Sequence, residues 1–344
     1  MDLELEYDED RGIYLLNKIR VLVLPKGSIE SIQNSVNIIL GLATKSIFQE
    51  VSSTVFYSFL QDLIKRKSLK IRGEEKTEIE MFTLFKELGI GRINKISSDL
   101  RNYKISIDGN MNSFLNIITN SPYCFNSIGL LTGIYRIITN KDVEVTEEKC
   151  RSTGDADTDY FNINVKETKD EYTYIPSQVF DEKNEKLKKI EITNDETDIF
   201  INSIPSEIIP VVYFPYLFSK LRKIIGQGVY GIENQAGKEL AKLYQQYNLQ
   251  LIKEKYGIMD LSVISILSGF GKITTLKNDL GYLLEVDVYN SFNALHIDDA
   301  IEKRCFLLGS ILSSLSYKIT GTMLRLNEKE CSAINDEVCK FSFQ

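Results

Sequence analysis

The sequence predicts an α+β fold made of two tandem copies of one domain, each with helices packed on an antiparallel sheet. A motif of Cys, Glu and Cys occurs twice with the same internal spacing, beginning at Cys124 and again at Cys305. A Gly-x-Gly turn, beginning at Gly89 and again at Gly269, follows a helical pattern in each half. Strands that follow one another closely, with helices before and between them, are typical of α+β folds and not of doubly wound α/β folds.

Each copy has the same order of expected elements. A strand leads into one or two helices, at about 28–66 in the first copy and 206–255 in the second. A short helix then ends at the Gly-x-Gly turn, and two strands with period-two alternation follow. A helix that starts near Cys124 or Cys305 comes next, and two final strands carry the rest of the cysteine motif.

Further landmarks repeat at a similar distance along the chain. Pro25 and Pro205 each end a strand-like run and precede a helical pattern. The tripeptide that begins at Asn112 is repeated at Asn290. Because every landmark of the second copy follows its counterpart at nearly the same distance along the chain, we interpret the pattern as an internal duplication.

A length of 344 residues suits two domains of ordinary size. We expect one domain at 1–165 and a second at 187–344, joined by a charged linker at 166–186 that is poor in aliphatic residues. The alternative for 166–186 is an excursion of the chain over a domain surface. We expect the two copies to pair with each other as an intramolecular pseudo-dimer, in place of a homodimer.

Composition excludes several classes of protein. A net charge of −7 argues against a nucleic-acid partner, which normally binds a basic face. No apolar run has the roughly 20 residues that a transmembrane helix needs. The N-terminal segment is acidic and does not resemble a signal peptide, so we expect a cytoplasmic protein. An odd number of cysteines, five, favours metal binding or free thiols over disulfides in that compartment.

The second cysteine motif predicts a metal site, and Zn²⁺ is the expected ion. Cys305 lies at the expected start of a helix, where backbone N–H groups favour a thiolate. Glu328 and Cys331 lie on or after a strand, and a turn returns the chain to Cys339 on the final strand. Three thiolates and a carboxylate would give a zinc site a net charge of −2, which requires surrounding donors. The alternative is three buried free cysteines and a solvated glutamate.

The first motif offers only three ligands, Cys124, Glu147 and Cys150. Eight residues beyond Cys150 stands Thr158, where the second motif has its last cysteine. We favour an empty remnant whose cysteines pack in the core. In the alternative, an aspartate completes a mixed site that binds its ion more weakly, since it has fewer soft ligands. The candidate aspartates are Asp155, Asp157 and Asp159.

At these residues the second half resembles the 4-vinyl reductase domain family, and the first half resembles it less closely. The residues that carry the resemblance in the second half are Gly269, Gly271, Asn290, Ser291, Cys305, Glu328, Cys331, Cys339 and Phe341. Those in the first half are Gly89, Gly91, Asn112, Ser113, Cys124, Glu147 and Cys150, and the last cysteine is absent.

The resemblance implies a structural zinc and an α/β module, often dimeric, with an apolar pocket for small hydrophobic or aromatic molecules. Members of that family include sensor domains of phenol-responsive activators, proteins linked to bacteriochlorophyll synthesis and many free-standing archaeal proteins. The fold is also similar to subunits of eukaryotic vesicle-tethering complexes. Phenol sensors of the family orient the ligand with a Trp and a His, whereas this chain has no Trp and one His, His296. We interpret His296 as a surface or helix-capping residue, with a pocket or metal-surrounding role as the alternative.

Four aromatic residues of the second copy bracket the space between its helices and its sheet. They are candidates for lining an apolar ligand pocket, although aromatic residues at such positions also serve as plain core. The four are Tyr256, Phe270, Tyr282 and Phe292.

The sequence therefore favours a non-enzymatic small-molecule binding protein with a structural zinc site in its C-terminal domain. The alternative is a scaffold or assembly subunit that binds protein partners, by analogy of fold with tethering complexes. An enzyme is suggested mainly by the family's name. The sequence shows no nicotinamide fingerprint, open metal position or paired acid and base.

Overall fold

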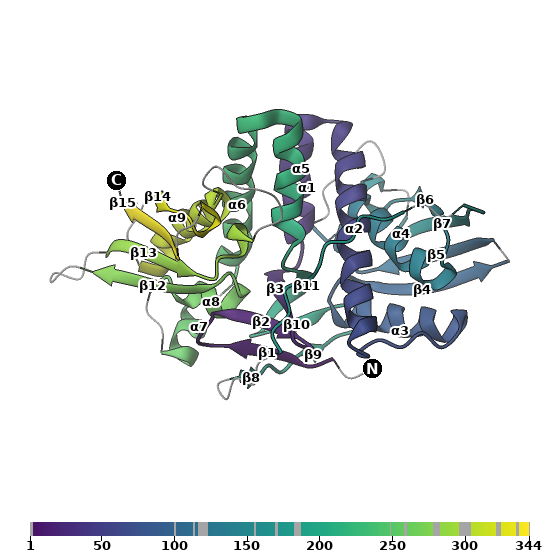
Figure 1. Ribbon diagram of the computed structural model, residues 1–344, viewed down its shortest axis with the longest axis horizontal. Coiled ribbons are helices and arrows are strands. Elements are labelled where there is room, and N and C mark those ends of the chain that lie inside the picture. The colour runs from purple at the N-terminus through teal and green to yellow at the C-terminus, as the bar shows by residue number, and fades with distance from the viewer. Residues whose placement is uncertain are drawn as a thin grey trace. The chain divides into compact units, whose positions relative to one another are not determined.

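The chain forms two compact units, each an α+β structure of helices and antiparallel strands, as predicted (Figure 1). Unit 1 consists of Met1–Leu3, Lys26–Ser177 and Ile192–Tyr213, and unit 2 of Glu4–Pro25, Gln178–Glu191 and Phe214–Gln344. The computed structural model describes residues 3–99, 101–112, 114–115, 123–154, 156–168, 171–181, 187–247, 249–257, 260–277, 283–295, 304–320, 325–334 and 337–343.

Each unit takes a short strand-rich segment from the other half of the sequence. Residues 4–25 group with the second half, and residues 192–213 group with the first half. The predicted domain boundaries at 165 and 187 do not include this exchange of segments between the units. Hydrophobic periodicity in the sequence indicates which face of a strand is buried, but it does not indicate which element covers that face. That 1–165 and 187–344 fold as separate domains stays a prediction.

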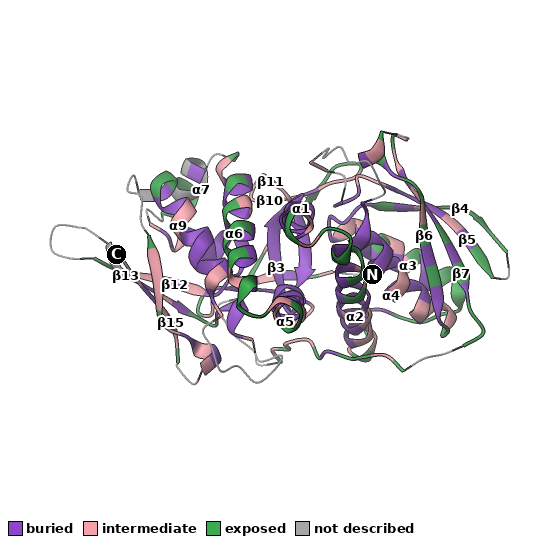
Figure 2. Cartoon of the chain, turned by 90° about the horizontal axis from the view of Figure 1, so that it is seen from above, coloured by how far each residue is buried: buried purple, intermediate pink, exposed green. Residues whose placement is uncertain are grey.

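Unit 1 is built on a four-stranded antiparallel sheet of order β4-β5-β7-β6. Helix α3 packs against β4, and α4 packs against both β6 and α2. Figure 2 shows buried residues along α2 and α4. The strands are β4 (Arg92–Ser98), β5 (Asn102–Asp108), β6 (Val143–Lys149) and β7 (Asp159–Val165), with β9 (Thr193–Asn194), β10 (Ile199–Ile201) and β11 (Ile204–Pro210) from the exchanged segment. The helices are α1 (Ser28–Leu40), α2 (Ala43–Lys65), α3 (Glu74–Glu87), α4 (Phe125–Thr139) and the short η1 (Arg151–Thr153).

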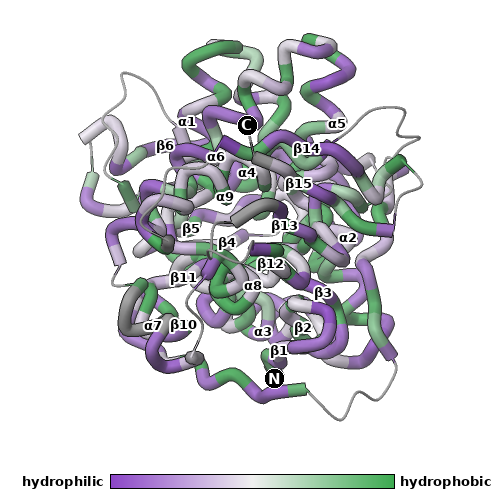
Figure 3. Tube along the Cα trace, turned by 90° about the vertical axis from the view of Figure 1, so that its left-hand side faces the viewer, coloured by the Kyte–Doolittle hydropathy of each residue, from purple (hydrophilic) through white to green (hydrophobic). Residues whose placement is uncertain are grey.

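Unit 2 repeats this plan with a sheet of order β12-β13-β15-β14. Helix α9 packs against α6 and β14. Helix α8, which Figure 3 colours by hydropathy, is mostly hydrophobic in sequence, and all six of its residues are buried. The strands are β1 (Leu5–Asp8), β2 (Ile13–Leu16), β3 (Ile19–Pro25), β8 (Leu187–Lys189), β12 (Lys272–Lys277), β13 (Leu283–Tyr289), β14 (Leu326–Glu330) and β15 (Cys339–Phe343). The helices are α5 (Tyr213–Ile225), α6 (Val229–Gln245), α7 (Leu249–Tyr256), α8 (Val263–Ser268), α9 (Phe306–Thr320) and the short η2 (Gly226–Gly228), η3 (Phe292–Ala294) and η4 (Ser332–Ile334). Among the described residues, no helix is long and apolar enough to cross a membrane.

The exchanged segments contain equivalent hairpins. In unit 2, Asn17 and Lys18 turn from β2 into β3 with φ of 49° and 71°, and in unit 1, Asn202 and Ser203 turn from β10 into β11 with φ of 54° and 63°. Two consecutive left-handed residues are the signature of a type I′ hairpin turn. Strands β3 and β11 then have equal lengths, and each ends on a proline.

The pairing of Pro25 with Pro205 predicted from the sequence is therefore wrong. Pro205 is the second residue of β11, and the proline that ends this strand, as Pro25 ends β3, is Pro210.

The predicted pairing of Asn112 with Asn290 is also wrong. The N–H of Met111 donates to the carbonyl of Ile90, and that of Phe292 donates to the carbonyl of Phe270 in the same way. Met111 is therefore the equivalent of Phe292, and the next residue, Asn112, is the equivalent of Asn293.

The Gly-x-Gly turns end helices, as predicted, and they also receive the exchanged strands. Gly89 and Gly269 have left-handed φ of 72° and 70°. A Cβ on Gly89 would lie 2.1 Å from the carbonyl oxygen of Ser206 in β11, and one on Gly269 would lie 2.8 Å from the Tyr14 ring in β2. Both turns therefore need glycine for the backbone conformation and for the close approach of a strand.

The described part of the predicted linker at 166–186 is bonded to unit 1 at one end and to unit 2 at the other. In unit 1, the N–H of Ile175 donates to Ser58 Oγ at 3.0 Å, and the N–H of Ser177 donates to Asp62 Oδ2 at 2.9 Å. In unit 2, the N–H of Phe180 donates to the carbonyl of Lys18 at 3.0 Å. Both interpretations of 166–186, a charged linker and an excursion over a domain surface, stay predictions.

Candidate metal centres

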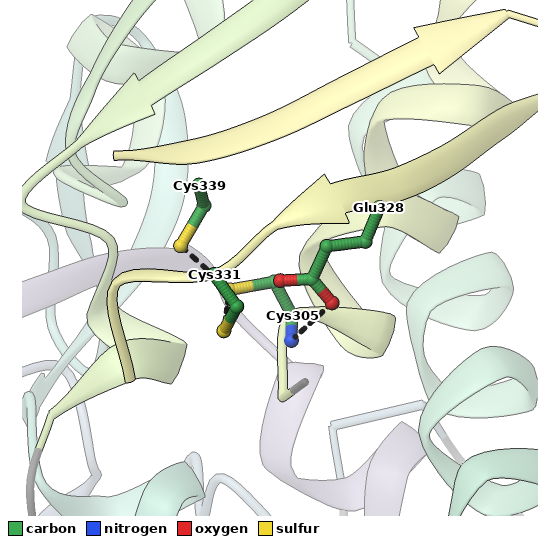
Figure 4. Close-up of side chains that lie close together, drawn as sticks. All are labelled: Cys305, Glu328, Cys331 and Cys339. Carbon is green, nitrogen blue, oxygen red and sulfur yellow. Dashed lines mark hydrogen bonds between the residues drawn. The ribbon is translucent and has the colours of Figure 1, made fainter. Parts of the chain in front are cut away.

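The four residues predicted to form a metal site in the second half converge in unit 2 (Figure 4). Cys305 directly precedes α9, Glu328 lies in β14, Cys331 follows β14, and Cys339 is the first residue of β15. One ligand atom from each residue lies within 4.8 Å of the other three. The three cysteines are fully buried. The start of α9, the end of β14 and the start of β15 therefore meet at one cluster of donors.

The sulfur separations suit a tetrahedral ion. Ligand atoms held about 2.3 Å from zinc at tetrahedral angles lie roughly 3.8 Å apart. Cys305 Sγ is 4.0 Å from Cys331 Sγ and 3.0 Å from Cys339 Sγ. The first distance fits directly, and the second is shorter than this separation. The donor set of three thiols and a carboxyl fits a zinc ion.

Hydrogen-bond donors surround the cluster, as a net charge of −2 requires. The hydroxyl of Ser291 lies 3.4 Å from Cys305 Sγ, and the N–H of Arg304 donates to Cys331 Sγ at 3.4 Å. The N–H and the hydroxyl of Ser332 lie 3.4 Å and 3.2 Å from Cys339 Sγ. These groups stabilise negative sulfur, so they are the surrounding donors that the sequence argument calls for.

Burial and mutual repulsion oppose full ionisation of the cluster by itself. Burial raises the pKa of the Cys305 thiol, and burial followed by the charge of Cys331 raises the pKa of Glu328 to about 9. Hydrogen bonds from Cys305 and then Cys331 lower the pKa of Cys339 to about 4. Burial therefore favours the protonated forms of Cys305 and Glu328, and a cation that binds to these groups releases their protons.

Unit 1 contains a second cluster of four donors, Cys124, Glu147, Cys150 and Asp159. Their ligand atoms also lie within 4.8 Å of one another, and Cys124 Sγ is 3.7 Å from Cys150 Sγ. The N–H of Cys124 donates to Glu147 Oε2 at 3.2 Å, as the N–H of Cys305 does to Glu328 Oε2 at the same distance. The favoured expectation, a three-ligand remnant, leaves Asp159 out, whereas the alternative, a mixed site completed by one of three aspartates, includes it.

Asp159 occupies the position that Cys339 has in unit 2. Asp159 is the first residue of β7 and Cys339 is the first residue of β15, and each of these strands comes last in the chain among the four strands of its sheet. Asp159 Oδ1 accepts a hydrogen bond from the N–H of Arg151, and Cys339 Sγ accepts one from the N–H of Ser332, the residue that follows the preceding cysteine in each case. Both the strand register and the donor therefore place Asp159 at the fourth corner.

Thr158 lies eight residues beyond Cys150, as Cys339 lies eight residues beyond Cys331, but its side chain is not at the fourth corner of the cluster. Its hydroxyl donates to the carbonyl of Ile107 and to Asp108 Oδ1, at 2.9 and 2.6 Å. The gap from Cys150 to the start of β7 is one residue longer than the gap from Cys331 to the start of β15. The period-two pattern of β7 identifies Asp159 as an inward position, and this signal could have found the ligand.

The unit 1 cluster shows similar electrostatics. Burial raises the pKa of the Cys124 thiol, and burial followed by the charge of Cys150 raises the pKa of Glu147 to about 9. A hydrogen bond from Cys124 lowers the pKa of Cys150 to about 6. The second carboxyl oxygen of Glu147, Oε1, is buried and has no hydrogen-bond partner in the part of the chain that the structure describes. A bound cation would satisfy this oxygen.

A groove of about 990 Å³ runs beside the unit 1 cluster, between α2, α4 and β6. Glu147 lies in its wall, so the groove reaches one of the four metal-site donors. Charged residues of α2, α4 and β6 lie along its sides. Its apolar wall includes Leu42, Tyr123, Phe125, Ile128, Val143 and Val145.

The predicted pocket residues of the second half lie in several environments. Phe270 and Phe292 are fully buried and stack on each other with ring centroids 4.6 Å apart. Tyr256 is half-buried at the end of α7. Tyr282 and His296 lie outside the described residues. Pocket lining by these aromatic residues stays a prediction.

Comparisons with known proteins find only distant likenesses. No protein-family model matches the chain, and no curated protein matches it. Among solved structures, the phenol-responsive sensory domain of the transcription activator PoxR with phenol is 16% identical, covers 47% of this chain and 84% of its own, and has a TM-score of 0.40.

Two further solved structures are similar to about two fifths of the chain. A trafficking protein particle complex subunit 3 from Naegleria fowleri, covalently bound to palmitic acid, is 19% identical over 42% of this chain and 98% of its own, with a TM-score of 0.34. A vinyl-4-reductase family protein from Methanocaldococcus jannaschii is 22% identical over 40% and 92%, with a TM-score of 0.26. At these TM-scores the three structures define neither the family nor the function of this chain.

Proposed function

We propose that this chain is a non-enzymatic protein that binds a small hydrophobic or aromatic molecule and holds a structural zinc ion in unit 2. The observation that carries the zinc assignment is the convergence of three buried thiols and a carboxyl from separate elements. Thiolates are the preferred ligands of structural zinc, and four protein donors fill its tetrahedral shell. The ion would tie the start of α9 to β14 and β15.

The zinc content of the purified full chain tests this assignment. After dialysis against a weak chelator, we expect one zinc ion per chain in the unchanged protein. Cys339→Ala should lose that ion, whereas Cys124→Ala, the same type of change in unit 1, should keep it. Elemental mass spectrometry measures the ratio. Full zinc retention by Cys339→Ala would overturn the assignment.

The groove of unit 1 supports the ligand-binding part of the proposal. Its volume of about 990 Å³ and its apolar wall suit a small molecule, because ligand sites typically occupy roughly 300–1,000 Å³. Ile128→Glu places a charge in that wall and should abolish binding of an apolar ligand. Ile79→Glu, at an exposed position of α3 outside the groove lining, is the matched control.

Native mass spectrometry of protein purified from its own cells provides the measurement. A non-covalent adduct of small mass should accompany the unchanged chain and the Ile79→Glu control, and it should be absent from Ile128→Glu. No adduct on any of the three, together with no binding of an apolar fluorescent probe, would refute small-molecule binding in this groove.

A scaffold that binds protein partners is the alternative function. The observation that favours it is the position of β6, which is an edge strand of its sheet and also lines the groove. An edge strand can pair with a strand of another protein. Co-purification of a stable protein partner, lost in Ile128→Glu and kept in Ile79→Glu, would favour this alternative over a small ligand.

Duplication of one domain completes the proposal. It is supported by the shared sheet order, by helices α4 and α9 of 15 residues each, and by the two equivalent donor clusters. Membership of the 4-vinyl reductase domain family, a cytoplasmic location and intramolecular pairing of the two copies stay predictions.

A further inference from the structure

The unit 1 cluster carries an inference beyond the proposed zinc site of unit 2. We propose that Cys124, Glu147, Cys150 and Asp159 form a second metal site, which binds a divalent transition-metal ion more weakly than the unit 2 cluster and exchanges it with the solution. The site would therefore be a real, chemically distinct centre and not an empty remnant of duplication.

The first support is a complete set of donors. Four ligand atoms, two thiol sulfurs and two carboxyl oxygens, lie within 4.8 Å of one another. Cys124, Cys150 and Asp159 are fully buried, and the described residues offer no hydrogen-bond partner to the buried oxygen Oε1 of Glu147. A buried carboxyl oxygen without a partner is costly, and a cation removes that cost.

The second support is the way in which Asp159 is held. The amide of Asn110 donates to Asp159 Oδ2 at 2.9 Å, and the N–H of Arg151 donates to Oδ1 at 2.7 Å. Asn110 is itself fixed, because its Oδ1 accepts hydrogen bonds from the hydroxyl of Ser127 and the N–H of Asn112. Hydrogen bonds of this kind orient metal-binding carboxylates. Asn110 would thus be a positioning residue for the site.

The third support concerns affinity and access. Two thiolates and two carboxylates make a harder donor set than the three thiolates and one carboxylate of unit 2, so this set holds zinc less tightly and tolerates harder divalent ions. Glu147 also lines the groove, so one of the four donor residues lies at a hollow of the surface. Weaker binding and faster exchange both follow.

Titration of the metal-free full chain with Zn²⁺, and separately with Co²⁺, against a chromophoric chelator tests the inference. We expect two ions per chain in two affinity classes. Asp159→Ala should remove the weaker class and leave the tighter one, whereas Cys339→Ala should remove the tighter class and leave the weaker one. A single class that Cys339→Ala abolishes and Asp159→Ala leaves unchanged would overturn the proposal.

Two further variants decide the case if Asp159→Ala disturbs folding, as judged by circular dichroism and by loss of the tight ion. Asp159→Cys recreates the donor set of unit 2 and should raise the zinc affinity of the weaker class. Asn110→Ala should lower it by roughly 10- to 100-fold, the usual effect of removing a group that orients a ligand. An unchanged affinity in Asp159→Cys would refute Asp159 as a ligand. Because Cys339→Ala reports the unit 2 ion separately, failure here leaves the proposed zinc site standing.

Discussion

The two units place similar backbone elements around interiors that differ in chemistry at several equivalent positions. In unit 1, polar side chains from α1, α2 and α4 form a buried hydrogen-bonded network. In unit 2, the equivalent positions of α5 and α9 carry aromatic and aliphatic residues. Equal helix lengths make the positions comparable: α1 and α5 have 13 residues each, and α4 and α9 have 15 each.

The network of unit 1 centres on Asn126. Its Nδ2 donates to Gln33 Oε1 at 2.8 Å, and its Oδ1 accepts from Ser52 Oγ at 2.7 Å and from the hydroxyl of Tyr213. Gln33 Nε2 in turn donates to the carbonyl of Tyr123 at 2.6 Å. Each of these side chains is thus satisfied inside the core, which is what a buried polar network requires.

The core of unit 2 has apolar residues at the same positions. Phe218 of α5 stands where α1 has Gln33, and Leu307 of α9 stands where α4 has Asn126. Phe214 makes edge contact with Phe292, with ring centroids 6.1 Å apart, and Phe292 stacks on Phe270. This core is stabilised by buried apolar area. The contrast shows that the same arrangement of helices can be packed around a hydrogen-bonded polar network or around apolar side chains.

Exchanging the central residues of the two cores should have the largest effect. Asn126→Leu removes one hydrogen-bond partner each from Gln33, Ser52 and Tyr213, and Leu307→Asn buries an amide among apolar residues. Each should lower the free energy of unfolding by roughly 2–5 kcal/mol. Urea unfolding measures the loss, and hydrogen exchange assigns it to a unit.

Asn162→Leu, at an exposed position of β7, is the control for the first exchange and should change stability by about 0.5 kcal/mol or less. If Leu307→Asn leaves the free energy of unfolding unchanged, the core of unit 2 tolerates a buried polar group, and the two interiors do not differ in the way argued from their residues.

A pH dependence of unit 1 should be the intermediate effect. Glu207 in β11 is fully buried, and its carboxyl accepts hydrogen bonds from the N–H groups of Gly27 and Ile29 at the start of α1. Its equivalent in β3 is Leu22, the fourth residue of a strand of equal length. Burial raises the pKa of Glu207 from 4.5 to about 8.

The folded chain therefore keeps a proton on Glu207 that the unfolded chain loses between pH 4.5 and about 8. Stability should fall as the pH rises through this window, by at most about 1.4 kcal/mol per pH unit, and level off above it. Glu207→Gln should remove this contribution, so the difference in stability between the variant and the unchanged chain should grow toward alkaline pH. A difference independent of pH from 5 to 9, roughly the window set by this pKa shift, would show that Glu207 is ionised in the fold.

The sequence predicts the unit 2 cluster well, because ligand type and spacing define it. The pattern consists of four residues whose types bind zinc, Cys305, Glu328, Cys331 and Cys339. The structure brings all four together. The α+β class follows similarly from the order of helical and alternating patterns.

The unit 1 cluster and the strand exchange are harder to predict from the sequence. One extra residue before β7 shifts the ligand position from Thr158 to Asp159, and counting residues cannot detect such a shift without the strand register. The association of Ser206 with Gly89, and of Tyr14 with Gly269, depends on which strand covers which turn. Local patterns carry no information about that choice.

The smallest expected effect concerns one asparagine that both units keep. In unit 1, Asn112 Oδ1 accepts hydrogen bonds from the N–H and the hydroxyl of Ser127, at 3.1 and 2.9 Å. In unit 2, Leu308 replaces that serine, and the buried Oδ1 of Asn293 has no hydrogen-bond partner among the described residues. The same residue is therefore satisfied in one unit and unsatisfied in the other.

Asn112→Ala should cost about 1–3 kcal/mol, because the buried N–H of Ser127 loses its side-chain acceptor. Asn293→Ala should cost less than about 1 kcal/mol, since removing an unsatisfied polar oxygen offsets part of the lost packing. Urea unfolding of the two variants side by side gives the comparison. Equal losses would mean that the Asn293 side chain finds partners in solution, and the polar and apolar interiors would then differ less than their residues indicate.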